Sequence, residues 1–278
     1  GLILHNLLME ELFKDKIKTF DFGFNAAYKK RWSSQTLLTS DVVIFPKGLK
    51  GGVIEFGQRI KKMVKQSNMN CAAAVDHEKP KSTLVLEVVN TLEGFHQLKN
   101  EWSELLNQSA SLGPFMSFEW LFSWWQGYYE GRDLLILKLV DNKKVVCIAP
   151  LMVYHTTVSR IPVKAIGFVG NHWMGGEFIF DSNVNKEECA GIIMEHLIQL
   201  KKLVILSYFR QPSITQKILT QEMDRMGIQY IYTERPVPII KKAGSWENYL
   251  KSRGNKFRYE YKTALKMAGK SGKIELVT

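Results

Sequence analysis

The side chains best suited to chemistry lie within one short stretch, Thr19 to Trp32, which reads TFDFGFNAAYKKRW. Every second residue from Phe20 to Phe24 is phenylalanine, a spacing that predicts a strand with one buried, aromatic face. Past the strand come one phenol, three cations and one indole, from Tyr28 onward. Polar groups at the carboxyl end of a strand commonly bind a ligand in an open α/β sheet. The alternative is a buried aromatic strand followed by a solvated basic turn.

The segments around this stretch read as elements that could hold it in place. Apolar residues at helical spacing predict a helix from Leu2 to Phe13, and its N-terminal amides would form an anion site. The segment from Leu37 to Phe45 reads as a strand, and the one from Val53 to Val64 as a basic amphipathic helix. A segment of small and polar residues, 67–81, reads as a linker.

Composition and charge limit the function classes. The chain has 278 residues, of which 45% are apolar, so it can form one large domain or two smaller ones. Its net charge of +11 is concentrated at the two ends, because residues 1–66 carry 12 Lys and Arg against 6 Asp and Glu, and residues 241–278 carry 10 against 3. Such ends suit phosphate-bearing ligands or an anionic membrane surface at least as well as DNA. The nucleic-acid alternative stays open on charge alone.

From residue 82 the chain reads as a second series of elements, in which helices and strands alternate with hairpins mixed in. They include an amphipathic helix from Leu92 to Gln108 and a strand from Ile228 to Tyr232. This order predicts an α+β fold of three layers, with a mixed central sheet and flanking helices. The aromatic segment from Phe118 to Tyr129 reads as a helix with a core stripe. The glycine-rich loop from Gly170 to Gly176 matches neither a P-loop nor the GxGxxG pattern. After Ser245, a helix N-cap, the last segment is rich in lysine and arginine.

Several of these stretches resemble the CelD-like branch of the GNAT acyltransferase superfamily. That branch is associated with bacterial cellulose and exopolysaccharide synthesis and is related to the Fem-type peptidyltransferases. FDFG followed by YKKRW resembles the end of the family's acyltransferase domain, and Gly1-Leu2 resembles the end of the small-residue turn that holds the acyl-CoA pyrophosphate. The segments FEWLFSWW, IAPLMV, IGFVG and LVILSYFRQPS and the basic helix at the end resemble the family's N-terminal half.

The resemblance implies an unusual domain order. Residues 1–66 resemble the C-terminal part of a GNAT-like domain, residues 82–240 an N-terminal subdomain, and residues 241–278 the start of a truncated second subdomain. One explanation is a fragment of a tandem protein, incomplete at both ends; the absence of an initial methionine favours it. The other is a permuted domain, in which residues 1–66 complete the sheet that residues 82–278 begin. A fragment would have little or no activity alone.

The function implied by the resemblance is transfer of an acyl group from acetyl-CoA or another acyl-CoA to an amine or hydroxyl on a sugar, lipid or peptide. The resemblance makes Asp21 the candidate base or acceptor-orienting carboxylate and Tyr28 the candidate acid, and it assigns Gly1 and Leu2 to cofactor binding. The candidates for contacts with phosphates or an anionic acceptor are Lys29, Arg31, Lys256 and Arg258. Trp32 is the candidate for stacking on a sugar, with simple packing as the alternative.

Two other function classes remain open. One is a non-catalytic scaffold that binds an envelope-polymer precursor or a protein, and the other is a Fem-type transferase that uses aminoacyl-tRNA. The six histidines and three cysteines show no metal-ligand spacing, so we expect no metal. The cysteine usage and the absence of a long apolar run favour the cytoplasm, with peripheral contact with the inner membrane as an option.

Overall fold

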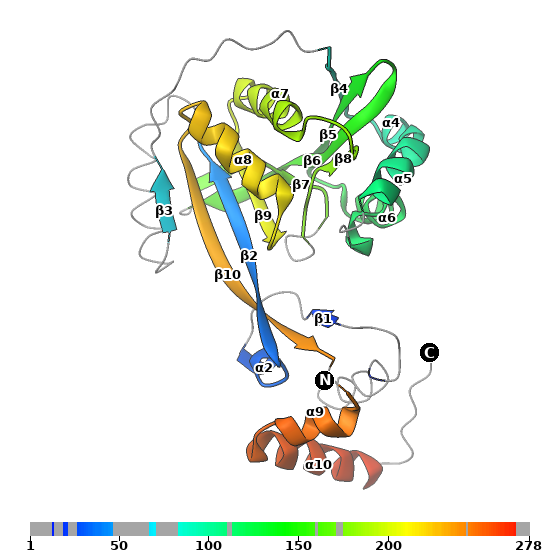
Figure 1. Cartoon of the computed structure of the whole chain (residues 1–278), viewed down its shortest axis with the longest axis vertical. Helices are drawn as coiled ribbons and strands as arrows, with labels where there is room; N and C mark the ends of the chain where they lie inside the picture. Colours follow the sequence, from blue (N-terminus) through cyan, green and yellow to red (C-terminus); the bar gives the residue numbers. More distant parts are fainter. Residues whose placement is uncertain are drawn as a thin grey trace. The chain divides into compact units, whose positions relative to one another are not determined.

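The computed structural model describes residues 13, 19–21, 27–46, 67–70, 83–109, 113–158, 161–170, 175–242 and 244–270. The described residues form two compact units. The central unit comprises Leu38–Arg235, and the terminal unit combines the two chain ends, Gly1–Leu37 and Pro236–Thr278. The chain passes from one unit to the other within β2 (Gln35–Ile44) and again within β10 (Tyr230–Lys241). Both of these strands belong to one sheet (Figure 1).

The sheet is mixed and open. Its main strand order is β1-β10-β2-β9-β7-β6-β5-β4, with β3 beside β10 and β8 beside β6. The remaining strands are β1 (Thr19–Asp21), β3 (Ser67–Asn70), β4 (Val85–Val89), β5 (Arg132–Asp141), β6 (Lys144–Val158), β7 (Ile161–Phe168), β8 (Ile179–Phe180) and β9 (Leu203–Arg210). The β7–β9 pairing is parallel, whereas every other described register is antiparallel.

Helices cover both faces of the sheet in the central unit. On one face lie α7 (Lys186–Gln199) and α8 (Ile214–Arg225), and on the other lie α4 (Leu92–Gln97), α5 (Lys99–Gln108), the 3-10 turn η1 (Pro114–Met116) and α6 (Phe118–Tyr128) (Figure 1). Alternate residues of β5 show why: Leu135 and Leu137 pack toward α7 and α8, and Leu134 and Ile136 toward α4 to α6. The predicted α+β arrangement of three layers is therefore confirmed.

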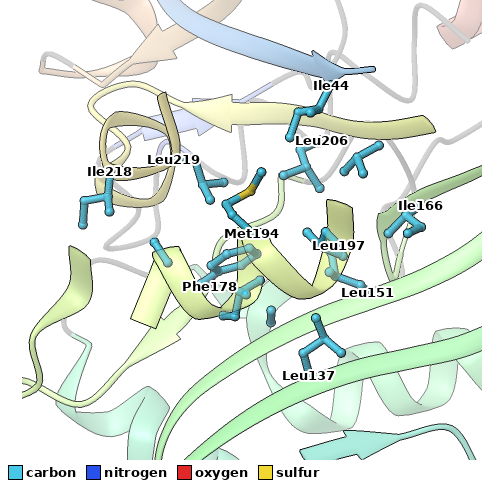
Figure 2. Packing of buried hydrophobic residues seen from close by; sticks show 14 of the residues in the cluster. Ile44, Leu137, Leu151, Ile166, Phe178, Met194, Leu197, Leu206, Ile218 and Leu219 are labelled. Atoms are coloured by element: carbon cyan, nitrogen blue, oxygen red, sulfur yellow. The ribbon is translucent and has the colours of Figure 1, made fainter. Parts of the chain in front are cut away.

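The larger of the two cores in the central unit lies under α7 and α8. Met194 and Leu197 of α7 and Leu219 of α8 pack with Leu151 and Leu206 of the sheet, and all five side chains are fully buried (Figure 2). Ile44 of β2 belongs to the same core. A strand from the first 66 residues therefore lies in the same sheet as strands from later residues.

Two of the boundaries in this part of the chain differ from the expected ones. Ser67–Asn70, the start of the expected linker, is strand β3 and pairs antiparallel with Tyr230–Thr233 of β10. The expected helix over residues 92–108 is divided at Leu98 into α4 and α5. The expected helices over residues 2–13 and 53–64 lie outside the described residues, apart from helical Phe13.

Candidate functional site

The basic chain ends meet in the terminal unit. It contains the short helix α2 (Ala27–Lys30), α9 (Trp246–Ser252) and α10 (Asn255–Lys270). Its described residues include twelve Lys and Arg against three Asp and Glu. Two regions of excess charge that are far apart in the sequence therefore form one strongly cationic unit. This property suits an anionic partner.

A small aromatic core holds α2, α9 and α10 together. Trp32, just past α2, is 3% exposed and contacts Phe257 of α10 edge to face, with ring centroids 4.8 Å apart. Trp246 stacks on Tyr249 at 5.2 Å, and the buried Tyr249 hydroxyl donates a hydrogen bond to the Trp32 carbonyl. Trp32 thus has the packed position that was the alternative to stacking on a sugar.

The predicted cations around this core have different surroundings. Arg31 forms an ion pair with Glu260 of α10 at 3.0 Å. Arg258 donates to the Lys251 carbonyl at 3.0 Å and to the Asn255 side chain. The Lys256 side chain is exposed. Arg31, Lys256 and Arg258 come together in one unit, but part of their hydrogen-bonding capacity is already used by the protein.

The other predicted site residues are only partly described. Lys29 is 6% exposed and has a protein partner, so it differs from a free surface cation. Asp21 is the last residue of β1, where its backbone pairs with Ile239, and Tyr28 lies in α2; their side chains are outside the described atoms. Gly1 and Leu2 are also outside the described residues. The assigned roles of these four residues stay predictions.

A second candidate site, which the sequence analysis did not identify, lies in the central unit. The parallel strands β7 and β9 are in register at Ala165↔Leu203 and Ile166↔Val204. Because they are parallel, the segments that follow their carboxyl ends lie at the same edge of the sheet. We call the residues that follow them, Val169–Gly170 with Gly175–Glu177 after β7 and Gln211–Gln216 after β9, the β7–β9 edge. A parallel pair in a mixed sheet is where α/β proteins tend to bind ligands.

Glu177 is the ionisable group at the centre of the β7–β9 edge. Its carboxylate accepts hydrogen bonds from the Ser213 and Thr215 side chains and from the Thr215 backbone. Ser213 is also the N-cap of α8, where it accepts from the Gln216 amide at 3.0 Å. Burial raises the pKa of the Glu177 carboxyl above its ordinary 4.5, although these hydrogen bonds partly oppose the shift.

A polar network extends this edge toward β2. The Gln211 side-chain amide donates to the buried Ser40 hydroxyl at 2.7 Å and to the Gln216 side chain at 3.2 Å. Asp41, which follows Ser40 at a β-bulge, accepts from the Tyr208 amide at 2.8 Å and pairs with Arg235 at 2.9 Å.

Tyr208 has a left-handed backbone with φ +70°, which is strained for an aromatic residue. Such strain persists only where surrounding contacts hold it, and it tends to occur at functional sites. The bond from its amide to Asp41 is one of these contacts.

Steric constraints explain why glycine occupies positions 175 and 176 in the loop after β7. A Cβ on Gly176 would lie 2.1 Å from the Phe168 ring, so no larger residue fits without a rearrangement. Gly175 has φ +84°, which other residues adopt rarely. These glycines let the chain pass closely over β7 and bring Glu177 to the start of α8. Their role in this structure is to position Glu177.

The chemistry available at the β7–β9 edge is proton transfer. A half-buried carboxyl group with a raised pKa is a stronger base than an ordinary surface glutamate. The N-terminus of α8, where a phosphate could bind, already holds the Glu177 carboxylate. The edge therefore suits a general base better than a phosphate cradle.

Other parts of the described structure are weaker candidates for a functional site. Cavities of about 240 and 390 Å³ lie beside the β5–β6 hairpin and share Glu101, Asn142, Lys143 and Val145, but none of the residues considered above lines them. Within the described ranges, no group of three or more His, Cys, Asp or Glu could hold a metal ion. None of the described helices is long and apolar enough to span a bilayer.

Comparisons with known proteins give little guidance. No family model matches the sequence, and no curated protein matches it. Among solved structures, the chain is similar to the C-terminal domain (DUF2156) of a proposed lysylphosphatidylglycerol synthetase from Agrobacterium fabrum, with 14% identity and a TM-score of 0.34. The similarity covers 76% of this chain and 61% of the other, so this chain spans less than two thirds of that structure. At this TM-score, that protein's activity is not transferred to this chain.

Proposed function

We propose that this chain belongs to a GNAT-like acyltransferase that moves an acyl group from acyl-CoA to an amine or hydroxyl on a sugar, lipid or peptide acceptor. One observation supports this proposal above others. Two stretches on which the family resemblance rests, IGFVG and LVILSYFRQPS, end at the same edge of the sheet, the β7–β9 edge. The polar network around Gln211 and the Glu177 carboxyl group, whose pKa is raised, lie at that edge.

The reaction needs one proton acceptor and one proton donor. The acceptor's nitrogen or oxygen attacks the thioester carbonyl carbon, the carbon–sulfur bond breaks, a base takes the acceptor's proton, and an acid protonates the CoA thiolate. The resemblance proposes Asp21 as base and Tyr28 as acid. Glu177 is a second candidate for the base because its surroundings raise its pKa. Three cations of the terminal unit, the exposed Arg31 and Lys256 and the partly buried Arg258, are the proposed contacts for the CoA phosphates.

Calorimetric titration of the chain with acetyl-CoA and with free CoA tests donor binding. We expect micromolar affinity for both, weakened at least ~10-fold in Arg31→Gln/Lys256→Gln because two phosphate contacts are lost. The matched control is Lys164→Gln/Lys217→Gln, which removes two exposed cations of the central unit. Absence of binding in a chain shown by circular dichroism to be folded would contradict the proposal, as would equal weakening in the control.

Thiol release from acetyl-CoA in the presence of a pool of amine and hydroxyl acceptors identifies the base. Removal of a general base lowers the rate ~10²-fold or more and leaves donor affinity unchanged. We expect Glu177→Gln or Asp21→Asn to have this effect, and the variant that does identifies the base. If neither variant changes the rate, both assignments are wrong.

A non-catalytic scaffold is the second candidate, and a specific observation favours it. Arg31 and Arg258 already bind protein groups, and Trp32 is buried, so three predicted substrate contacts have structural roles. A scaffold would show no affinity for acetyl-CoA. An aminoacyl-tRNA donor is a third candidate, which the cationic terminal unit would suit; titration with tRNA in place of acetyl-CoA distinguishes it.

A further inference from the structure

Helix α10 has one face in the aromatic core of the terminal unit and the opposite face in solvent. Phe257 contacts Trp32, and Tyr261 contacts Trp246 with ring centroids 5.9 Å apart, so these two residues mark the inner face. At 3.6 residues per turn, the residues about half a turn away form the outer face. They are Tyr259, Lys262, Lys266 and Lys270, and together with the exposed Met267 beside them we call them the outer face of α10.

The outer face consists of two parallel rows. Lys262, Lys266 and Lys270 follow each other at intervals of four residues and form a row of exposed cations. Tyr259 and Met267 lie on the adjacent row and are 72% and 66% exposed. A row of ammonium groups therefore runs beside a row of exposed apolar side chains.

No acidic side chain interrupts these rows. The acid of α10, Glu260, belongs to neither row, and its carboxylate pairs with Arg31. Arg258 is turned toward Lys251 and Asn255. None of the five residues of the outer face is among the cations proposed above to bind CoA phosphates. Within the described residues no carboxylate pairs with the three lysines of this face, so its charge suits an anionic partner.

The apolar row limits the kind of partner. A nucleic-acid backbone would satisfy the lysines but offers no apolar region for the exposed Met267 side chain. A bilayer surface offers both, because lysine ammonium groups bind lipid phosphates while their stems, with tyrosine and methionine, enter the boundary of the acyl chains. Each lysine near an anionic bilayer contributes about 1 kcal/mol of binding free energy.

We propose that the outer face of α10 docks this protein on a bilayer that contains anionic phospholipid. Electrostatic attraction through the lysine row supplies most of the affinity, and Tyr259 and Met267 supply the apolar contact. This proposal is independent of the acyl-transfer proposal, since it uses none of the residues assigned to donor binding or proton transfer.

Co-sedimentation of the full chain with vesicles tests the proposal. We expect binding to vesicles of equal parts phosphatidylglycerol and phosphatidylcholine, none to phosphatidylcholine alone, and a decrease with salt. Lys262→Gln/Lys266→Gln/Lys270→Gln should reduce the partition coefficient ~100-fold, which is about fivefold for each lysine. Tyr259→Ser/Met267→Ser should reduce it severalfold and leave its salt dependence unchanged. The matched control, Lys99→Gln/Lys164→Gln/Lys217→Gln, removes three exposed cations of the central unit and should bind like the native chain.

Two results of this experiment would contradict the proposal. No binding to the anionic vesicles by the folded native chain, or an equal loss in the control, overturns the proposal. A single-stranded RNA oligonucleotide serves as the other anion. If it binds, if the triple lysine variant loses that binding, and if vesicles do not bind, the face is a nucleic-acid surface. Acetyl-CoA titration of the same variants, without vesicles, reports on donor binding separately.

Discussion

Glu177 provides a prediction at the scale of one residue, since burial raises the pKa of its carboxyl group. The folded chain then holds this proton at pH values where the unfolded chain has lost it. The free energy of unfolding should therefore decrease as the pH rises from 4.5, the ordinary glutamate pKa, through the raised pKa. Glu177→Gln, which cannot ionise, should remove this decrease. Urea unfolding of both proteins over a pH series measures it.

The control for that series is Glu187→Gln, which replaces an exposed carboxyl group in the first turn of α7. It should leave the pH dependence of the native chain in place. If Glu177→Gln and the native chain lose stability in parallel as the pH rises, the carboxyl of Glu177 is not the group responsible.

The loss of two different contacts in the terminal unit should lower its free energy of unfolding by different amounts. Tyr249→Phe leaves the buried Trp32 carbonyl without its hydrogen bond and should destabilise the unit by about 1–2 kcal/mol. Arg31→Gln breaks an ion pair whose side chains are 57% and 34% exposed, so its cost should stay below about 1 kcal/mol. Urea unfolding followed by tryptophan fluorescence compares them. A larger loss in Arg31→Gln would reverse this ranking of the two contacts.

At the scale of an element, α8 depends on its first turn. Ser213 caps the helix and also donates to Glu177, whereas Ser245 caps α9 from an exposed position. Ser213→Ala should therefore cost about 1–2 kcal/mol and Ser245→Ala about 0.5–1 kcal/mol. Chemical unfolding of the two variants checks the order. Equal costs would show that the bond to Glu177 adds nothing to the cap.

The element boundaries that sequence patterns did not predict have physical causes. Strand β10 was expected to end at Tyr232 but continues to Lys241 through Pro236 and Pro238. Prolines argue against an inner strand because they cannot donate to a neighbour. Here they lie between the residues paired with β3 and those paired with β1, where the described register assigns no partner on that side. Spacing in the sequence cannot reveal such a gap.

The predicted range of helix α6 agrees with the structure to within one residue, but only some of its aromatic residues belong to the predicted core stripe. Phe118, Leu121 and Trp125 form the expected core stripe. Trp120 and Tyr128, however, are 38% and 59% exposed. Six of its eleven residues are aromatic and they lie on both faces, so the hydrophobic period that separates a buried from an exposed face is weak here.

At the scale of the whole molecule, composition located the charge but could not show that both ends form one unit. The strand pairings that join them, such as Thr19↔Lys241, connect residues more than two hundred positions apart. The β7–β9 edge was missed for the same reason, because Glu177 and Ser213 have no motif spacing and meet only through the parallel pairing. Local periodicity predicts elements, whereas sites made by distant residues depend on tertiary contacts.

The two units should differ in stability because their cores differ in size. The buried core of the terminal unit consists of Trp32, Ile240, Trp246 and Tyr249, whereas the central unit has two extensive cores, one under α7 and α8 and one under α4 to α6. Since stability follows buried apolar area, α9 and α10 should open before the central sheet. In hydrogen–deuterium exchange followed by mass spectrometry, their amides should exchange at least ~10-fold faster than those of β6 and α7.

A variant distinguishes local opening from global unfolding. Trp32→Ala removes the ring that packs on Phe257 of α10 and should speed exchange in α9 and α10. Exchange in β6 and α7 should not change if the central unit holds its structure without help from the terminal core. Leu197→Ala, which creates a cavity in the core under α7 and α8, should instead speed exchange in the central unit. If either substitution accelerates both units equally, the two cores unfold as one cooperative structure, and ligand binding in the terminal unit would then stabilise the whole chain.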